Sequence, residues 1–378
     1  MKYRVLSTAC EYRKDRISAD EVEKNNYIST ENMLPNRGGV ETASSIAEGK
    51  TFPAYKEGDI LLSNIRPYFK KIWFADKKGG CSNDVLVLKT NKSVDKRFLY
   101  YVLSDNNFFN YSTVTSKGTK MPRGSKTAIM KYLVPDVDMP TQKRIADILS
   151  AYDDLIENNN RRIALLEKAA QELYKEWFVR FRFPGHENAK FENGLPMGWD
   201  VAKLGSILIL EDTKRVPLSE QQRSGMQPIY PYYGACSIAG YVDKYIFDGV
   251  YLLLSEDGAN VVDENGYPTL QYVWGKFWVN NHAHIISKNG VYSVEFLHLL
   301  LKNTNMQSIV TGAAQPKISQ KRLLNKKVIV PDSKIIQLFS ERIDPIYKMI
   351  RYISESNRNI EKQRELLLPR LMSGKLEV

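Results

Sequence analysis

Apolar side chains recur at alternating steps of four and three residues along two long stretches of the chain. This spacing brings one face of an α-helix against a partner helix, as in a coiled coil. The first stretch runs through Ile145, Leu149, Tyr152, Ile156, Asn159, Ile163, Leu166, Ala170, Leu173 and Trp177. The second runs through Phe339, Ile343, Ile346, Ile350, Ile353, Asn357, Ile360, Arg364, Leu367 and Leu371, where Arg364 weakens one layer. Both stretches therefore predict a long helix with a coiled-coil seam.

The two predicted helices are separated by a stretch long enough for a globular domain. If they pair with each other, the second must return along the first, so we expect an antiparallel coiled coil with pseudo-two-fold symmetry. The alternative is a pair of surface helices that each cover only their own domain.

The chain also repeats itself at a distance of about 197 residues. The segment Val134-Pro135-Asp136 is matched by Val330-Pro331-Asp332, and the two predicted helices also match each other in sequence. Each helix follows a globular stretch of similar length, so the repeated unit is a domain plus a helix. Such a duplication predicts a molecule with two heads.

The repeat and the breaker residues divide the chain into five segments. Residues 1–138 form a first domain, 139–183 a first long helix, 184–198 a linker rich in Gly and Pro, 199–332 a second domain and 333–378 a second long helix. Asp344-Pro345 is typical of a helix start, so the last helix is expected either to begin again or to kink at Pro345.

Within the two domains, short apolar runs lie between Gly, Asn, Asp and Pro, which is the pattern of strands. The predicted strands are Asp59 to Ser63, Val85 to Leu88, Tyr251 to Leu254, Phe277 to Val279 and Ala283 to Ile286. One short helix is expected in each domain, over Lys96 to Leu103 and Val294 to Lys302. The predicted fold class is α+β, with two mixed α/β domains that are each followed by a long helix.

Composition adds a bias in charge. The 378 residues are 43% hydrophobic and 26% charged, as in ordinary globular proteins. No apolar run approaches the ~18 residues of a membrane span and the start resembles no signal peptide, so we expect a cytoplasmic protein without membrane contact. The 54 Lys and Arg against 43 Asp and Glu give a net charge of +11, which favours a polyanionic partner.

A search for catalytic motifs is negative. No Gly-x-Gly pair is present to hold a dinucleotide or S-adenosylmethionine, and no two prolines are adjacent, as the usual amino-methyltransferase motif requires. Gly49-Lys50-Thr51 imitates the end of a P-loop but lacks its leading glycine. We therefore expect no cofactor and no methyl transfer by this chain alone.

Two further groups of residues resemble metal-dependent active sites, and the sequence does not exclude either of them. Asp59 with Asp76-Lys77-Lys78 has the residue types of a metal-dependent nuclease, although no further carboxylate supports it. His282 and His284 without another His or Cys nearby make a poor metal site. The polar side chains around them either touch a ligand or satisfy buried backbone groups.

The remaining signal lies in two loops at matching positions before the long helices. The first carries Lys117, Thr119, Lys120, Arg123 and Lys126, and the second carries Gln315, Lys317, Ser319, Gln320, Lys321 and Arg322. Lys and Arg suit phosphates, whereas Gln, Ser, Thr and Asn can read base edges. One such loop alone is as readily a solvated basic loop, but two copies favour DNA.

Longer motifs carry a family resemblance over essentially the whole chain. They are YISTEN (Tyr27 to Asn32), GDILLSNIRP (Gly58 to Pro67), YYGACSIAGYVD (Tyr232 to Asp243), LLLSEDGAN (Leu252 to Asn260), WVNNHAHI (Trp278 to Ile285) and the helical QKRIADILSAYDDLIENNNRRIALLEK and RELLLPRLMSGKLEV. In these motifs the chain resembles the specificity subunits of type I restriction-modification systems, which have two target recognition domains.

The resemblance implies a DNA-reading subunit without a catalytic site of its own. Its implied partners are double-stranded DNA, modification (methyltransferase) subunits, expected in two copies, and restriction (translocase and nuclease) subunits. The helix pair would serve as a ruler and docking platform, so that the two heads read a bipartite, asymmetric target with a fixed spacer. A stand-alone nuclease and a pure scaffold are the rival interpretations.

Candidate DNA-binding residues come from the matching motifs in each head. They are Arg66, Lys117, Thr119, Lys120 and Arg123 in the first head, and Tyr233, Glu256, Asn260, Asn281, His282, Gln315, Lys317 and Ser319 in the second. Glu256 either accepts a hydrogen bond from cytosine or anchors a neighbouring basic side chain.

Overall fold

The computed structural model describes residues 2–376 of the chain. The chain divides into two compact units, one comprising Met1–Asn158 and Ser356–Val378 and the other comprising Asn159–Glu355. We call them unit 1 and unit 2. Among the described residues, no helix combines the length and the apolar character needed to cross a lipid bilayer.

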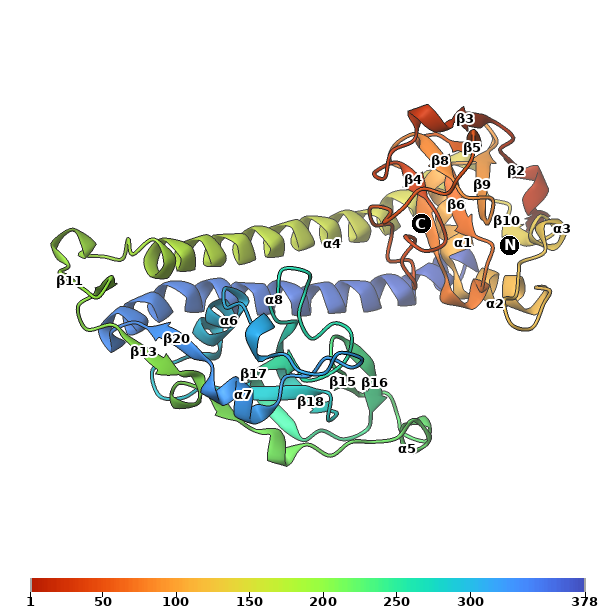
Figure 1. The fold of residues 1–378 in the computed structure, drawn as a ribbon. Helices are drawn as coiled ribbons and strands as arrows, with labels where there is room; N and C mark the ends of the chain where they lie inside the picture. The colour runs from red at the N-terminus through yellow and green to blue at the C-terminus, as the bar shows by residue number, and fades with distance from the viewer. Residues whose placement is uncertain (1, 377–378) are drawn as a thin grey trace. The chain divides into compact units, whose positions relative to one another are not determined.

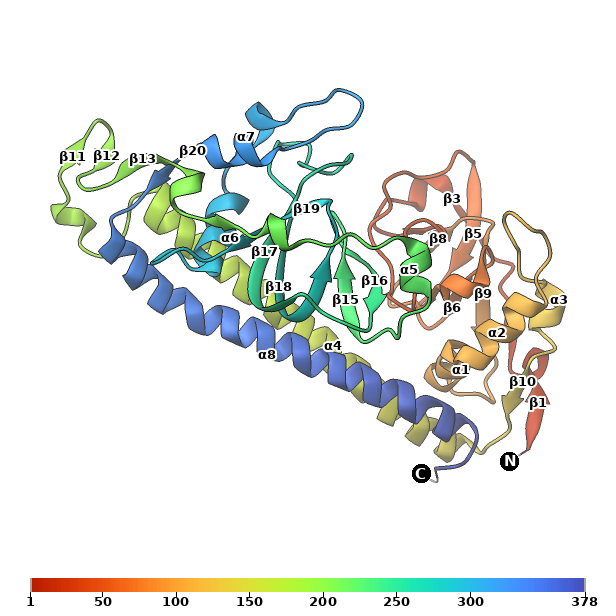
Figure 2. The ribbon, with the colours of Figure 1, turned by 90° about the horizontal axis from the view of Figure 1, so that it is seen from below.

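Two long helices, α4 (Met139–Tyr174) and α8 (Ser333–Met372), each belong partly to unit 1 and partly to unit 2. Unit 1 contains the beginning of α4 and the end of α8, and unit 2 contains the remaining parts. Within each unit the two helices therefore run in opposite directions, side by side (Figures 1 and 2). Every predicted seam position is buried or half-buried. The predicted antiparallel pairing is confirmed.

The charged seam residue Arg364 has its partner inside unit 1. Its guanidinium forms an ion pair with the carboxylate of Asp153 on α4. The same carboxylate accepts a hydrogen bond from the Tyr101 hydroxyl at 2.6 Å. The seam layer that Arg364 was expected to weaken is thus held by a hydrogen-bonded ion pair.

Helix α8 is continuous through Pro345, so the predicted fresh start of the helix there is wrong. Proline lacks the N–H group that would bond to the carbonyl of Glu341, a loss that costs about 3 kcal/mol in a helix interior. Ile343 and Tyr347, on either side, are only 0% and 4% exposed in the core of unit 2. Their burial offsets the missing hydrogen bond.

Unit 1 is built on short strands. They are β1 (Tyr3–Val5), β2 (Cys10–Tyr12), β3 (Arg16–Ser18), β4 (Tyr27–Ile28), β5 (Thr51–Tyr55), β6 (Ile60–Ser63), β7 (Ile72–Phe74), β8 (Gly79–Cys81), β9 (Val85–Thr90) and β10 (Leu133–Pro135). They form two four-stranded sheets, in the orders β2-β9-β6-β7 and β3-β5-β8-β4, and the antiparallel pair β1-β10. All four residues of β6 are buried, as its continuous apolar run predicts.

The short α-helices in the described part of unit 1 are α1 (Lys96–Ser104), α2 (Asn106–Val114) and α3 (Lys126–Ile129). The Asp95 carboxylate caps α1 by accepting the Phe98 N–H at 2.9 Å. Leu88 of β9, Leu99 of α1, Leu149 of α4 and Leu371 of α8 share one core and are at most 1% exposed. The sheet, α1 and the two long helices are therefore packed around a common apolar centre.

Unit 2 repeats this plan with longer strands. They are β11 (Phe191–Glu192), β12 (Leu195–Pro196), β13 (Asp200–Lys203), β14 (Ile209–Leu210), β15 (Tyr230–Tyr233), β16 (Ile238–Val242), β17 (Phe247–Ser255), β18 (Leu270–Val279), β19 (Ala283–Ser287) and β20 (Lys327–Val330). Six of them form one sheet in the order β14-β19-β17-β18-β15-β16, and β13 pairs with β20 as β1 pairs with β10. The short helices are α5 (Glu220–Ser224), α6 (Val294–Lys302) and α7 (Gln320–Asn325).

An aromatic cluster joins the sheet of unit 2 to its helices. Phe178 lies in a π-helical turn, η4 (Lys175–Val179), at the end of α4. Its ring centroid is 4.7 Å from that of Phe339 on α8 and 5.6 Å from that of Phe296 on α6. Helix α6 packs against β17 and β18 (Figure 2). This cluster fixes the second head to its share of the long helices.

The five predicted strands and both predicted short helices are present, and α6 has the predicted bounds. The stretch expected to be a plain linker contains the hairpin β11-β12. Its two turn residues, Asn193 and Gly194, have φ of 51° and 80°, as a type I′ turn requires. The predicted α+β fold class is confirmed.

Candidate nucleic-acid interface

In unit 1, the predicted basic loop is closed by its own backbone. The Lys117 N–H donates to the Arg123 carbonyl and the Arg123 N–H donates back to Lys117, both at 2.9 Å. Gly118 allows the turn with φ of 94°. The loop is fixed to the end of β6, because Arg66 N–H donates to the Pro122 carbonyl at 2.8 Å. The basic loop is therefore an ordered element beside the sheet.

Unit 2 contains the same loop at the matching position. The Thr311 N–H and the Lys317 N–H donate to each other's carbonyls at 2.9 and 2.7 Å. Gly312 has φ of 88°. The Gly258 N–H donates to the Pro316 carbonyl at 3.1 Å, which fixes the loop to the end of β17. The duplication seen in the sequence therefore extends to individual backbone hydrogen bonds.

A third segment completes the site in each unit. The turn before β9 joins the end of β6, since Asn64 N–H donates to the Asp84 carbonyl at 2.8 Å. The turn before β19 joins the end of β17 in the same way, through Glu256 N–H and the His282 carbonyl at 2.9 Å. Each unit thus brings together a basic loop and two strand-end turns, and we call this arrangement the three-segment site.

The structure brings the five candidates of unit 1 together in its three-segment site. Lys117, Thr119 and Lys120 are exposed. Arg123 forms an exposed ion pair with Asp84 at 3.2 Å. Arg66 is half-buried with φ of 50°, and its guanidinium lies 5.9 Å from the Phe69 ring centroid. The unit 1 site therefore contains several cationic side chains, most of them exposed.

Most candidates of unit 2 also converge. Asn281, His282, Gln315 and Lys317 are exposed in its three-segment site. The His282 imidazole hydrogen-bonds to the Asp257 carboxylate, with Nδ1 and Oδ1 at 2.7 Å. This surface carries amide, imidazole, carboxylate and ammonium groups, which together can donate and accept hydrogen bonds at base edges.

Three candidates of unit 2 lie elsewhere or serve the fold. Tyr233 is 8% exposed in the apolar core, where its ring packs edge-on against Phe277 at 5.7 Å, which favours a packing role over a base contact. Ser319 accepts the Arg322 N–H at 3.4 Å as the cap of α7. Asn260 is exposed in the loop after β17, where its carbonyl lies 3.9 Å from the Cys236 thiol.

Glu256 belongs to a buried ion network under the unit 2 loop. Its carboxylate accepts from the Arg215 guanidinium at 2.7 Å and pairs with the Lys317 ammonium at 3.1 Å. Arg215 also pairs with Asp212 at 3.3 Å, and Asp212 accepts from His284 Nδ1 at 2.6 Å. Of the two interpretations of Glu256, the structure favours the anchor for basic side chains.

The network keeps its carboxylates ionised despite their burial. Burial raises the pKa of Asp212, but the hydrogen bond from His284 and the charge of Arg215 outweigh it and leave the pKa below its usual value. For Glu256, burial likewise raises the pKa, and the hydrogen bond from Arg215 with the nearby His284 and Lys317 lowers it further than burial raises it. Both side chains therefore remain anions around a central guanidinium.

Asp212, Glu256 and His284 have the residue types of a metal site, with ligand atoms within 4.8 Å of one another. The Arg215 guanidinium already binds both carboxylates, and His284 Nε2 lies 2.8 Å from the Ile318 carbonyl. A divalent cation would meet a fixed positive charge and a histidine whose two nitrogens both face acceptors. The geometry fits an internal ion network better than a metal centre.

Asp59, one member of the proposed nuclease pair, is engaged by other side chains and backbone groups. Asp59 is 4% exposed, and its two oxygens accept from Arg13 at 2.6 and 2.9 Å. Its backbone neighbour Lys56 donates an N–H to the same carboxylate at 2.8 Å. Hydrogen bonding to Asp59 raises the pKa of Arg13 above its usual value. This arrangement stabilises a turn and gives the nuclease alternative no support.

Three participants in the three-segment sites were missed at the sequence level: Asp84, Arg215 and Asp257. Asp84 stands 198 residues before His282, at the matching position of the repeat. Applying the repeat to both heads would have found it. Arg215 carries no such signal, because its carboxylate partner Glu256 is 41 residues away in sequence.

Replacing Gly312 with alanine is expected to disrupt the unit 2 loop. An added Cβ would lie 2.3 Å from the Gln315 carbonyl oxygen, on a backbone with φ of +88°. At the matching Gly118 the nearest atom would be 3.5 Å away, so Gly118→Ala adds only a left-handed strain of about 1–2 kcal/mol. Thermal unfolding should therefore shift to lower temperature in Gly312→Ala more than in Gly118→Ala, and equal shifts would contradict the loop geometry.

Residues 9–168 and 196–362 match the family model described as the type I restriction modification DNA specificity domain. The chain is 26% identical over 304 residues to the type I restriction enzyme MjaIX specificity subunit of Methanocaldococcus jannaschii, covering 75% of this chain and 70% of that protein. It is 27% identical over 379 residues to the MjaVIII specificity subunit of the same organism, covering 93% and 86%.

A solved structure supports the same fold. The S subunit of a type I restriction-modification system from M. genitalium superposes with a TM-score of 0.57 at 16% sequence identity. The superposition covers 98% of this chain and 96% of that one. At this identity the likeness concerns the fold alone.

Proposed function

This chain belongs to the type I restriction-modification DNA specificity family, and we propose that it is the subunit that reads the target DNA of such a system. The observation that carries the proposal is the three-segment site, which is built once in each unit with the same backbone hydrogen bonds. Ordered loops at strand ends are a common place for specific recognition, because the sheet fixes their geometry.

The two sites differ in chemistry, so we expect them to read different sequences. The unit 1 site is dominated by cations, namely Arg66, Lys117, Lys120 and Arg123. The unit 2 site also offers Asn281, His282 and Gln315. Arg and Lys are suited to phosphates and guanine, whereas Gln and Asn are suited to adenine. The proposed target is therefore bipartite and asymmetric.

We assign residues 1–138 and 199–332 as the two target recognition domains, joined by the spacer helices 139–183 and 333–378 and the linker 184–198. The 40 residues of α8 correspond to roughly 60 Å of helix, on the order of 17 base pairs at ~3.4 Å each. The helices would set the length of the unread spacer between the two half-sites.

The chain is proposed to contribute recognition and no catalysis. Modification (methyltransferase) subunits, expected in two copies, would dock along the helices and methylate the bound target, and restriction (translocase and nuclease) subunits would join that complex. All of this would take place on double-stranded DNA in the cytoplasm.

Exchanging one recognition domain tests this assignment. Residues 199–332 are replaced by the second domain of a family member with a different target, and methylated sites are mapped in the presence of the cognate modification subunit. We expect one half-site to change and the other half-site and the spacer to stay the same. The reciprocal exchange of residues 1–138 is the control and should change only the other half-site. A change in both halves from one exchange would contradict independent reading.

A further inference from the structure

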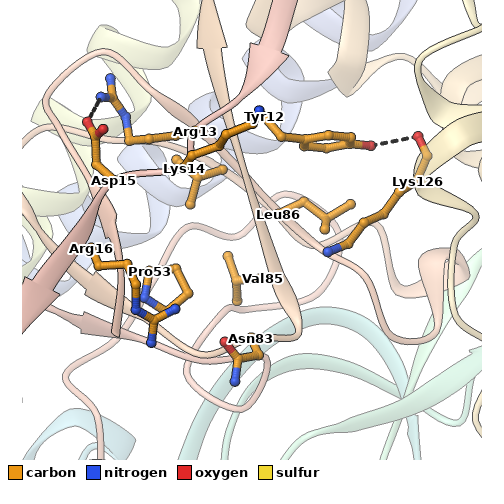
Figure 3. A pocket seen from close by; sticks show the side chains of 11 residues that line it. Tyr12, Arg13, Lys14, Asp15, Arg16, Pro53, Asn83, Val85, Leu86 and Lys126 are labelled. Atoms are coloured by element: carbon orange, nitrogen blue, oxygen red, sulfur yellow. Dashed lines mark hydrogen bonds and ion pairs between the residues drawn. The ribbon is translucent and has the colours of Figure 1, made fainter. Parts of the chain in front are cut away.

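A basic pocket of about 350 Å³ lies beside the three-segment site of unit 1. Its lining includes Tyr12, Lys14, Arg16, Asn83 and Lys126. Asn83 directly precedes Asp84, the partner of Arg123, and Lys126 lies at the end of the basic loop, where α3 begins. Figure 3 shows the Arg16 and Lys126 side chains entering the pocket from opposite sides. The pocket therefore adjoins the candidate recognition loop and shares its chain segments.

The side chains that line this pocket carry more positive than negative charge. Its one carboxylate, Asp15, is engaged by the Arg13 guanidinium at 2.6 Å, and Arg13 is held on its other side by Asp59. Lys14, Arg16 and Lys126 remain as excess cations. Arg16 is oriented by two hydrogen bonds to Thr51, from Nε to the hydroxyl at 2.9 Å and from Nη2 to the carbonyl at 2.8 Å. The pocket offers an anion a partly pre-ordered group of donors.

The internal repeat supplies a comparison for each of these positions. Arg13 N–H donates to the Val87 carbonyl at 2.9 Å, and the matching Glu211 N–H donates to Ile285 at 2.8 Å. Ser125 and Ser319 cap the short helices that follow the two loops. These anchors place Lys14 of unit 1 opposite Asp212 of unit 2 in the repeat, Leu86 opposite His284, and Lys126 opposite Gln320.

In unit 2 the matching positions are closed by the protein's own groups. The Asp212 carboxylate accepts from His284 Nδ1 at 2.6 Å and from Gln320 Nε2 at 2.7 Å. Asp212 and His284 are fully or almost fully buried there. At the position of the Asp212 anion, unit 1 has Lys14. At the position of the neutral donor Gln320 it has Lys126, and these residues line an open pocket. Unit 2 carries its anion internally, and unit 1 has room and cations for an external one.

We propose that this pocket binds a backbone phosphate of the DNA duplex, next to the bases that the unit 1 loop reads. The inference rests on the proposed function and adds the contact that positions the first head. Lys and Arg provide most such contacts, which hold a protein in place on the duplex without reading sequence. Each neutralised phosphate also releases counterions, so the contact makes binding more dependent on salt.

The test uses Lys14→Gln and Lys126→Gln, the second of which introduces the residue that unit 2 carries. Lys92→Gln is the matched control, an equal loss of charge just beyond the opposite end of β9; all three lysines are exposed. Each full-length variant is combined with the cognate modification subunit, and the dissociation constant for target and scrambled duplexes is measured over a range of salt concentrations.

We expect Lys14→Gln and Lys126→Gln to weaken binding to both duplexes alike. The slope of log K against log salt should fall by about 1 for each lysine, with the methylated sequence unchanged. Lys92→Gln should leave the slope unaltered. Unchanged slopes in the two pocket variants would overturn the phosphate contact, as would a changed methylated sequence. If the unmodified complex itself shows no preference for any target, the proposed function fails instead.

Discussion

Arg215→Ala is expected to destabilise unit 2 by about 3–5 kcal/mol, because it leaves two buried carboxylates without their central cation. Asp212 and Glu256 are 6% and 8% exposed, and Arg215 pairs with both. The remaining side-chain partners, His284, Gln320 and Lys317, cannot replace a guanidinium that bridges the two acids. The affected carboxylates anchor the unit 2 loop, so DNA recognition by this head should be lost as well.

Arg123→Ala in unit 1 is the matched control. Arg123 pairs with Asp84 in the matching three-segment site, but their side chains are 57% and 38% exposed. Solvent screens such a pair, so its loss should cost about 0–1 kcal/mol. Both losses of stability are measured by unfolding in urea, with hydrogen exchange as the readout for each unit separately. Similar losses in the two variants would show that the unit 2 network is not the buried support inferred from the geometry.

The contribution of the same network to the stability of unit 2 depends on pH. The pKa values of Asp212 and Glu256 are lowered in the folded chain from ordinary values of 3.8 and 4.5. Their contribution to stability is therefore fully present above about pH 4.5 and is lost as the pH falls through the lower, folded values. The stability gap between the parent and Arg215→Ala should narrow as the pH falls, because protonation of the two carboxylates removes the negative charges that Arg215 neutralises.

Removing one heptad from each long helix is expected to shorten the unread spacer of the target. Residues 156–162 of α4 and 354–360 of α8 are deleted together, which keeps the seam in phase on both helices. Seven residues correspond to about 10 Å, or roughly 3 base pairs. The two half-sites should be unchanged and their separation reduced, as read by mapping methylated sites with the modification subunit.

The control variant for this deletion keeps both helices at their full length and changes only their sequence. Exposed residues of the same two heptads are replaced while the seam positions remain, and the spacer should then be unaltered. A heptad deletion that left the spacer at its original length would contradict the role of the helices as a ruler.

The long helices and the two-headed plan could be predicted because their signals are local or periodic. Spacing alone predicts the buried seams. Four of the seam residues, Ile145, Leu149, Phe339 and Ile343, are at most 2% exposed. The 197-residue repeat pointed to both loops. At Pro345 only the alternative of a fresh helix start was wrong, since local propensity cannot register the tertiary burial that keeps α8 continuous across it.

The side chains of the site were harder to predict because residue type does not reveal burial. Tyr233 has a base-contacting type but fills the core beside Phe277. For Glu256 the sequence left both a base contact and an anchor open, and the structure favours the anchor through Arg215, a contact made across 41 residues of sequence. Such pairings depend on which strands become neighbours, and a single sequence does not specify that for polar residues.

We propose that this chain reads DNA for a methyltransferase and performs no chemistry itself. The most direct measurement maps methylated adenines in genomic DNA treated with the chain alone, the cognate modification subunit alone, and the two together. We expect methylation at one bipartite, asymmetric site in the mixture only. Methylation or site-specific cleavage of DNA by the chain alone would contradict it.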